Sequence, residues 1–154
     1  MSTFTSLTYH VVFATKLRRP LITREIRDHL YAYIGGIIRD EKGHLIEVGG
    51  MPDHIHILAG FSPTVAVSDM LRQIKAGSSK WLNERPDVID RFEWQRGYGA
   101  FTVSQSEIGR VRRYIQGQEE HHQTQSFRDE LVRLLQRHQI PFEERYLFDG
   151  EHHG

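Results

Sequence analysis

Two histidines separated by a single residue, His54 and His56, are the first candidates for chemistry in this sequence. The alternating apolar residues around them predict a strand, in which side chains two apart point to the same face. Both imidazoles then face one way, while Ile55 and Ile57 face the other. Neutral histidine is the commonest metal ligand, so this spacing suits a shared ion. The alternative is a pair of polar side chains on a solvent-facing strand, and two ligands do not complete a metal site.

A tyrosine on a later predicted helix offers a second reactive group. Residues advance by about 100° along a helix, so Tyr114 and Gln118, four apart, share one face beside the apolar stripe. Tyrosine can act as a covalent nucleophile, and a nearby cation favours its phenolate. Gln118 offers an oxygen as the third metal ligand, and His121 is a competing candidate. Alternatively, Tyr114 lies at the edge of the core with its hydroxyl bound to water.

The elements that must position these groups alternate between strands and helices. The apolar pattern predicts strands over 7–14, 44–48, 54–61 and 98–103. It predicts helices from 26 to about 42, from 67 to 82, from 104 to about 122, and from 126 onward. The order β-α-β-β-α-β is the ferredoxin-like, or split βαβ, arrangement. We therefore expect an α+β fold with an antiparallel sheet and additional C-terminal helices, the first of which carries Tyr114.

Local signals mark the ends of several elements. Residues 49–53, rich in glycine and proline, predict a turn between the second and third strands. Thr23 is a plausible N-cap for the first helix. Ser104 and Glu107 have the spacing of a capping box, which predicts the start of the third helix.

Composition narrows the class of protein. The chain has 154 residues, enough for one domain with a sizeable core. The absence of cysteine excludes disulfides, thiol nucleophiles and thiolate metal sites, and it is typical of a reducing cytoplasm. No apolar run is long enough to span a membrane, so we expect a cytoplasmic protein. Because 20 basic residues balance 20 acidic ones, broad non-specific affinity for duplex DNA is disfavoured, although local basic patches remain.

An ordered set of motifs is far more specific than the two histidines alone. The motifs are YHVVFATK at 9–16, RRP at 18–20, MPDHIH at 51–56, WQRGYGAF at 94–101, YIxxQ at 114–118, EEHH at 119–122, SF at 126–127 and ERY at 144–146. In this order they resemble the single-tyrosine transposases of the insertion-sequence 200/605 family, including its REP-associated relatives, which belong to the HUH nuclease superfamily. The likeness covers residues 5–148, so we expect a single transposase domain over 1–154.

The resemblance implies a mechanism. His54 and His56 would bind a divalent cation, magnesium or manganese (Mg²⁺ or Mn²⁺), with Gln118 as third ligand, and the ion would polarise the scissile phosphate. Tyr114 would attack the phosphorus of single-stranded DNA, leaving a 5′-phosphotyrosine and a free 3′-hydroxyl. A second 3′-hydroxyl would then displace the tyrosine. The residues alone leave the metal open, because imidazole also suits zinc, nickel or copper.

The resemblance also implies partners. Members of this family are typically homodimers in which the tyrosine helix of one subunit completes the histidine site of the other. They recognise DNA hairpins at element ends, and their single-stranded bases can stack on aromatic groups while basic side chains track phosphates. The candidate DNA-binding residues are Arg18, Arg19, Lys75, Lys80, Arg112 and Arg113.

Two other functions fit parts of the sequence. One is a non-catalytic or host-adopted module of the same fold that only binds hairpin DNA. The other is a metal-dependent phosphodiesterase that uses activated water, with Tyr114 merely packing. RNA-binding domains of this shape carry aromatic residues on central strands, whereas the strand over 54–61 carries histidines.

Overall fold

The computed structural model describes residues 2–88 and 90–147. Its centre is a four-stranded antiparallel sheet in the order β2-β3-β1-β4. The strands are β1 (Thr8–Ala14), β2 (His44–Met51), β3 (His54–Gly60) and β4 (Gly99–Thr102). The predicted α+β class and the predicted order of strands and helices are confirmed.

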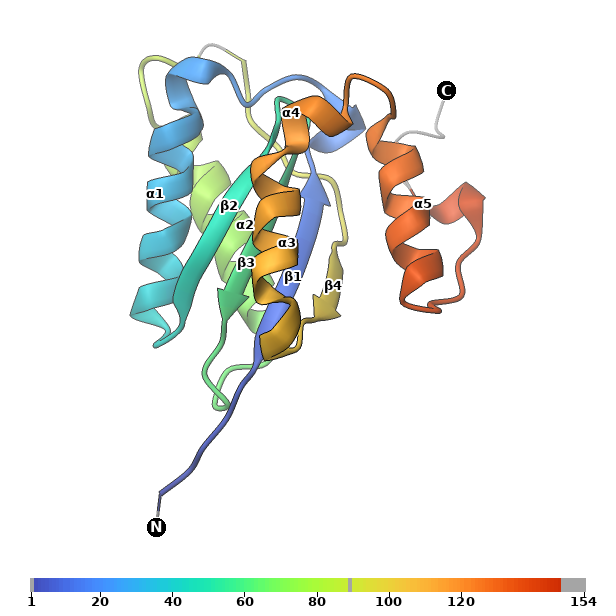
Figure 1. The fold of residues 1–154 in the computed structure, drawn as a ribbon. Coiled ribbons are helices and arrows are strands. Elements are labelled where there is room, and N and C mark those ends of the chain that lie inside the picture. Colours follow the sequence, from blue (N-terminus) through green and yellow to red (C-terminus); the bar gives the residue numbers. More distant parts are fainter. Residues whose placement is uncertain (1, 89, 148–154) are drawn as a thin grey trace.

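The helices lie on both faces of this sheet (Figure 1). Helices α1 (Arg24–Asp40) and α2 (Val67–Asn83) cover one face, and α3 (Ile108–Gln116) lies over the other. Two further helices, α4 (Gln118–His121) and α5 (Phe127–Arg137), follow α3. Short 3-10 turns occupy Lys16–Arg18, Gln105–Glu107 and Glu144–Tyr146. Among the described residues, no helix is both long and apolar enough to cross a membrane.

Strand alternation divides the apolar residues between the two layers. On one side, Ile55 and Ile57 join the main core formed with α1 and α2. On the other side, Val12 and Ala14 pack with Phe127 and other apolar residues of α5. The central strands are therefore buried on both faces, because helices cover each of them.

Strand β3 places the two histidines in the middle of the sheet. In the register, His56 lies opposite Val12 of β1 and Gly49 of β2. A Cβ atom at Gly49 would lie only 2.9 Å from the backbone oxygen of Ile115 in α3. The absence of a side chain at Gly49 thus lets α3 approach the sheet closely beside the histidines.

Two predicted boundaries are wrong. Strand β2 continues to Met51, so the turn predicted over 49–53 shrinks to two residues, because the glycines there pair with β3. The third helix, predicted over 104–122, begins as a 3-10 turn and is interrupted at Gly117, where the helix-disfavouring glycine separates α3 from α4. The Ser104 side chain caps no backbone N–H and instead contacts the Ser106 hydroxyl.

Candidate functional site

The two histidines of β3 lie on the face of the sheet away from α1 and α2, in a buried space lined by residues of α3, α4 and α5. His54 and His56 are each 0% exposed. This burial rules out the alternative of a solvent-facing pair. Buried imidazoles need polar partners, and the structure supplies them on both ring nitrogens.

The Nδ1 atom of each histidine in this space is held by a neighbouring group. His54 Nδ1 lies 2.7 Å from Asp53 Oδ1, and His56 Nδ1 lies 2.8 Å from Nε2 of the buried His10. His122, which follows α4, donates from Nδ1 to the backbone carbonyl of Gln125 at 2.8 Å. The Nε2 atoms of these three rings are thereby turned toward the centre of the space.

The carboxylate of Glu130 on α5 occupies that centre, and only 1% of this residue is exposed. Its Oε1 atom lies 2.9 Å from His56 Nε2, 3.1 Å from His122 Nε2 and 3.4 Å from His54 Nε2. Its Oε2 atom accepts hydrogen bonds from the Gln118 amide at 2.9 Å and from the Tyr114 hydroxyl. Glu130 thus links the histidines to the tyrosine.

Tyr114 and Gln118 both reach this cluster. The Tyr114 ring lies 5.8 Å from the His56 ring between centroids, and Gln118 Oε1 lies 3.0 Å from His54 Nε2. His121, the competing candidate for the third ligand, packs against the Tyr114 ring at 4.7 Å. In this structure the chain therefore brings its own tyrosine to its own histidines.

Burial and neighbouring charges shift the pKa values of several groups in the cluster strongly. Burial alone would raise the pKa of Glu130, but hydrogen bonds from His54 and His56 outweigh it and hold that pKa far below its usual range. Burial lowers the pKa of His54, yet the carboxylates of Asp53 and Glu130 outweigh burial and raise it to about 9. Burial, with a contribution from the Glu130 charge, raises the pKa of Tyr114 well above its ordinary value. Tyr114 is therefore a neutral phenol in this arrangement.

For two other histidines, His56 and His10, the effect of burial on the pKa is not outweighed by neighbouring carboxylates. Burial lowers the pKa of His56, and burial together with the neighbouring His56 lowers the pKa of His10 to about 3. A lowered pKa favours the neutral imidazole, which is the form of histidine that binds metal ions.

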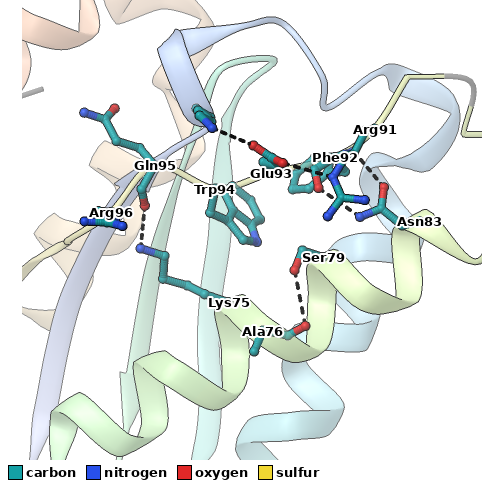
Figure 2. Close-up of a pocket in the computed structure, with 11 residues that line it drawn as sticks. Lys75, Ala76, Ser79, Asn83, Arg91, Phe92, Glu93, Trp94, Gln95 and Arg96 are labelled. Carbon is teal, nitrogen blue, oxygen red and sulfur yellow. Dashed lines mark hydrogen bonds and ion pairs between the residues drawn. The ribbon is translucent and has the colours of Figure 1, made fainter. Parts of the chain in front are cut away.

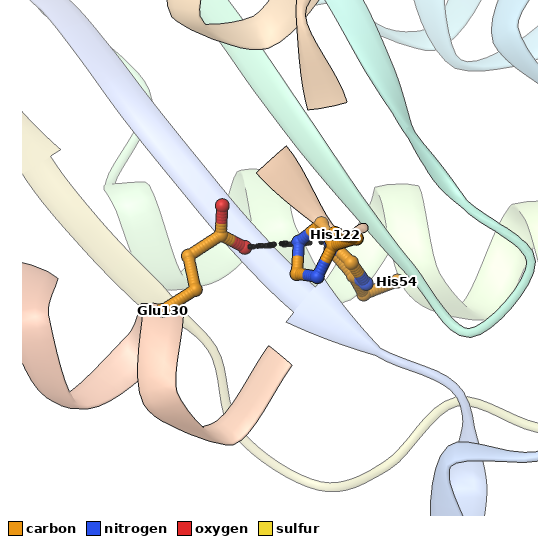
Figure 3. A group of neighbouring side chains, drawn as sticks. All are labelled: His54, His122 and Glu130. Carbon is orange, nitrogen blue, oxygen red and sulfur yellow. Dashed lines mark hydrogen bonds and ion pairs between the residues drawn. The ribbon is translucent and has the colours of Figure 1, made fainter. Parts of the chain in front are cut away.

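The donor set fits a divalent metal ion. Ligand atoms of His54, His122 and Glu130 all lie within 4.8 Å of one another (Figure 3). Imidazole nitrogens and a carboxylate oxygen are common ligands of divalent transition ions. This combination, buried and lined with acceptor atoms, is chemically suited to hold one.

Sequence reasoning missed the roles of Glu130, His122 and His10. Glu130 follows Phe127 by three residues and precedes Leu134 by four, so it lies within the apolar stripe of α5. A charged residue in a buried stripe signals a partner, and this signal was present in the sequence. His10 and His122 lie within the motifs at 9–16 and 119–122, but their positions in the sequence assigned them no role in the site.

The candidate DNA-binding residues do not form one patch. Lys75 and Lys80 lie on α2, whereas Arg112 and Arg113 lie on α3, across the sheet. Arg18 and Arg19 lie in and just after the first 3-10 turn. Arg112 pairs with Glu47 at 3.0 Å.

Lys75 lines a cavity of about 460 Å³ between α2 and residues 91–96 (Figure 2). Its ammonium group donates hydrogen bonds to the backbone carbonyls of Gln95 at 2.6 Å and Gly97 at 2.8 Å. Burial lowers the pKa of Lys75 to about 8. These contacts tie the loop before β4 to α2, which gives Lys75 a structural role.

Replacing Lys75 by methionine should therefore destabilise the fold. We expect Lys75→Met to lower the free energy of unfolding by about 1–3 kcal/mol, because two charge-assisted hydrogen bonds are lost. Lys80→Met, at an exposed position on the same helix, should change it by less than about 0.5 kcal/mol. Urea denaturation of both variants measures the difference. Equal stability of the two would show that the Lys75 contacts contribute nothing.

Comparison with known proteins gives a consistent family. The sequence model of the family described as "Transposase IS200 like" matches residues 3–118, a span that contains both strand histidines and ends at Gln118. The chain is 26% identical to the ISDra2 transposase TnpA of Deinococcus radiodurans over 73% of this chain and 84% of that protein. It is 30% identical to the transposase for insertion sequence element IS200 of Salmonella typhimurium, over 71% and 75% of the two chains.

Solved structures show the same fold. A crystal structure of a putative transposase from Deinococcus radiodurans R1 aligns with a TM-score of 0.58 and 26% identity, covering 77% of this chain and 95% of that one. A REP-associated tyrosine transposase bound to a REP hairpin aligns with a TM-score of 0.60 and 18% identity, covering 79% and 74%.

Proposed function

Because this chain belongs to the IS200-like transposase family, we propose that it cleaves and rejoins single-stranded DNA through a covalent 5′-phosphotyrosine on Tyr114. The observation that carries the proposal is the hydrogen-bonded cluster that joins the Tyr114 hydroxyl, through Glu130, to His54, His56 and Gln118. A nucleophile beside a candidate cation site is the arrangement that nucleophilic phosphoryl transfer requires.

The proposed metal ligands are His54, His56 and Gln118, and the proposed ion is Mg²⁺ or Mn²⁺. When bound, this ion would polarise the scissile phosphate and favour the phenolate of Tyr114. Asp53 and His10 orient the two strand histidines by occupying their Nδ1 atoms. Such outer contacts fix the ring orientation of ligating histidines.

The bond changes follow from a tyrosine nucleophile. The Tyr114 oxygen bonds to phosphorus while the bond to the 3′-oxygen breaks, and the phenolic proton passes in net terms to the 3′-hydroxyl. In the second step a different 3′-hydroxyl attacks, the phosphotyrosine bond breaks and Tyr114 regains a proton. One phosphodiester replaces another, so no ATP is needed.

The proposed DNA ligand is a hairpin at the end of a mobile element, joined to the single strand that is cut. The structural neighbour bound to a REP hairpin supports this ligand class. Basic residues on both faces, including Lys80 and Arg113, are the proposed phosphate contacts. The proposal extends to a single transposase domain over 1–154 and to a homodimer, in which the Tyr114 helix exchanges between subunits by moving about the polar loop before Gly99 and the polar segment 123–125.

The test is a denaturing gel of the protein incubated with 5′- or 3′-labelled single-stranded DNA that carries the element ends flanking the gene. With Mn²⁺, a protein-sized band should carry the label on the 3′ side of the cut, since that fragment bears the 5′-phosphate. EDTA should remove the band. Cleavage without a covalent band would instead favour the nuclease that uses water. A native-gel shift without any cleavage would indicate a binding module.

A further inference from the structure

Building on the proposed function, we propose that the C-terminal helices complete the cation site. Glu130 of α5 and His122, just after α4, join the proposed ligands His54, His56 and Gln118 as direct ligands. The resulting site binds Mn²⁺ in preference to Mg²⁺. Both added ligands lie beyond the span 3–118 that the family model matches.

The separations of the donor atoms carry this inference. Gln118 Oε1 lies 3.0 Å from His54 Nε2 and 3.2 Å from His122 Nε2. Glu130 Oε1 lies 3.4 Å and 3.1 Å from the same two nitrogens. The four atoms thus form a closed ring. Bonds of about 2.0–2.2 Å to a common ion put adjacent donors roughly 2.8–3.6 Å apart, so the side chains already have the spacing of a ligand set.

The orientation of the two imidazoles is that of metal ligands. Ligating histidines almost always donate their other ring N–H to a carboxylate or a backbone carbonyl. His54 does so toward Asp53, and His122 does so toward the carbonyl of Gln125. Gln118 is oriented in the same way, because its amide nitrogen donates to Glu130 Oε2 and its oxygen therefore faces the rings.

A shared position between three donor atoms supports the same ligand set. His122 Nε2 lies 3.2 Å from Gln118 Oε1 and 3.1 Å from Glu130 Oε1. A cation bound among these atoms would take one ligand from each side chain.

The same donors decide which cation fits. Mg²⁺ prefers six oxygen ligands and retains several of its waters, whereas imidazole suits transition ions and carboxylate suits Mn²⁺. Three imidazole nitrogens with two oxygens, buried under α5, favour Mn²⁺. Glu130 would then contact the ion through Oε1 while its Oε2 holds the Tyr114 hydroxyl, so one carboxylate positions both the ion and the nucleophile.

The test is titration calorimetry of the metal-free, full-length protein with Mn²⁺ or Mg²⁺ in the absence of DNA. We expect Mn²⁺ to bind at least tenfold more tightly than Mg²⁺. Glu130→Gln, which keeps the shape of the side chain, should weaken Mn²⁺ binding at least tenfold, and His122→Gln should do so independently. Asp129→Asn is the matched control, because Asp129 is the adjacent acid on α5 and is exposed. Thermal unfolding verifies that each variant is folded.

Three results would overturn the inference: no Mn²⁺ binding to the parent, equal affinity for Mg²⁺, or parent-like Mn²⁺ affinity in folded Glu130→Gln. Because DNA is absent, this outcome is independent of the proposed function. Mn²⁺ binding that depends on Glu130, without any covalent DNA product, would support the site and contradict the transposase mechanism. A covalent DNA product together with parent-like Mn²⁺ affinity in Glu130→Gln would support the transposase mechanism and contradict Glu130 as a metal ligand.

Discussion

Tyr114→Phe should abolish the covalent protein–DNA product entirely while leaving DNA binding and Mn²⁺ binding close to those of the parent. The substitution removes one oxygen atom, and that oxygen is the proposed nucleophile. The ring remains packed between His56 and His121, so the shape of the site is kept. Loss of the hydrogen bond to Glu130 should lower the free energy of unfolding by only about 1–3 kcal/mol.

The measurement is the denaturing gel with labelled single-stranded DNA and Mn²⁺, run beside a native gel for binding. Tyr33→Phe is the matched control, because Tyr33 lies on α1 and stacks on Trp81 on the opposite side of the sheet. It should form the product at the parent rate. A covalent product in Tyr114→Phe would mean that another residue is the nucleophile. Equal cleavage by the parent and Tyr114→Phe, without a covalent product in either, would mean that water is the nucleophile.

His54→Ala should have two large effects, loss of metal-dependent cleavage to background and a lower free energy of unfolding. The first follows because His54 Nε2 faces both Gln118 and Glu130, so its removal takes a ligand from the centre of the site. The second follows from burial. The His54 ring stacks on Phe127 of α5 at 4.4 Å, and the Asp53 carboxylate loses its partner.

We expect the destabilisation to be about 2–4 kcal/mol, from a cavity and unpaired polar groups. A histidine on a solvent-facing strand could be replaced with little loss of stability, so the expected destabilisation follows from the burial of His54. Urea denaturation measures the stability, and the cleavage gel measures the activity. His29→Ala, at an exposed position on α1, should change neither. Retained metal-dependent cleavage in folded His54→Ala would exclude His54 as an essential ligand.

The sequence by itself determined the order of the elements and the direction of several side chains. Period-two alternation placed His54 and His56 on one face of a strand and Ile55 and Ile57 on the other, and the structure has this division. Such inferences succeed because side-chain direction within a strand or helix follows from local backbone geometry. Element boundaries were less certain, as the interruption at Gly117 shows, because a single glycine changes the helix only slightly in energy.

Only the tertiary structure decided which faces meet. Glu130 lies 74 residues from His56 along the chain, yet its carboxylate is 2.9 Å from that imidazole. Periodicity shows that α5 has a buried stripe, but it does not show that this stripe packs against β1 and β4 beside the histidines. For the same reason, periodicity did not predict the burial of both strand histidines or the backbone contacts of Lys75. Each depends on helices packing over a sheet, and that packing is set by long-range burial of apolar surface rather than by local sequence.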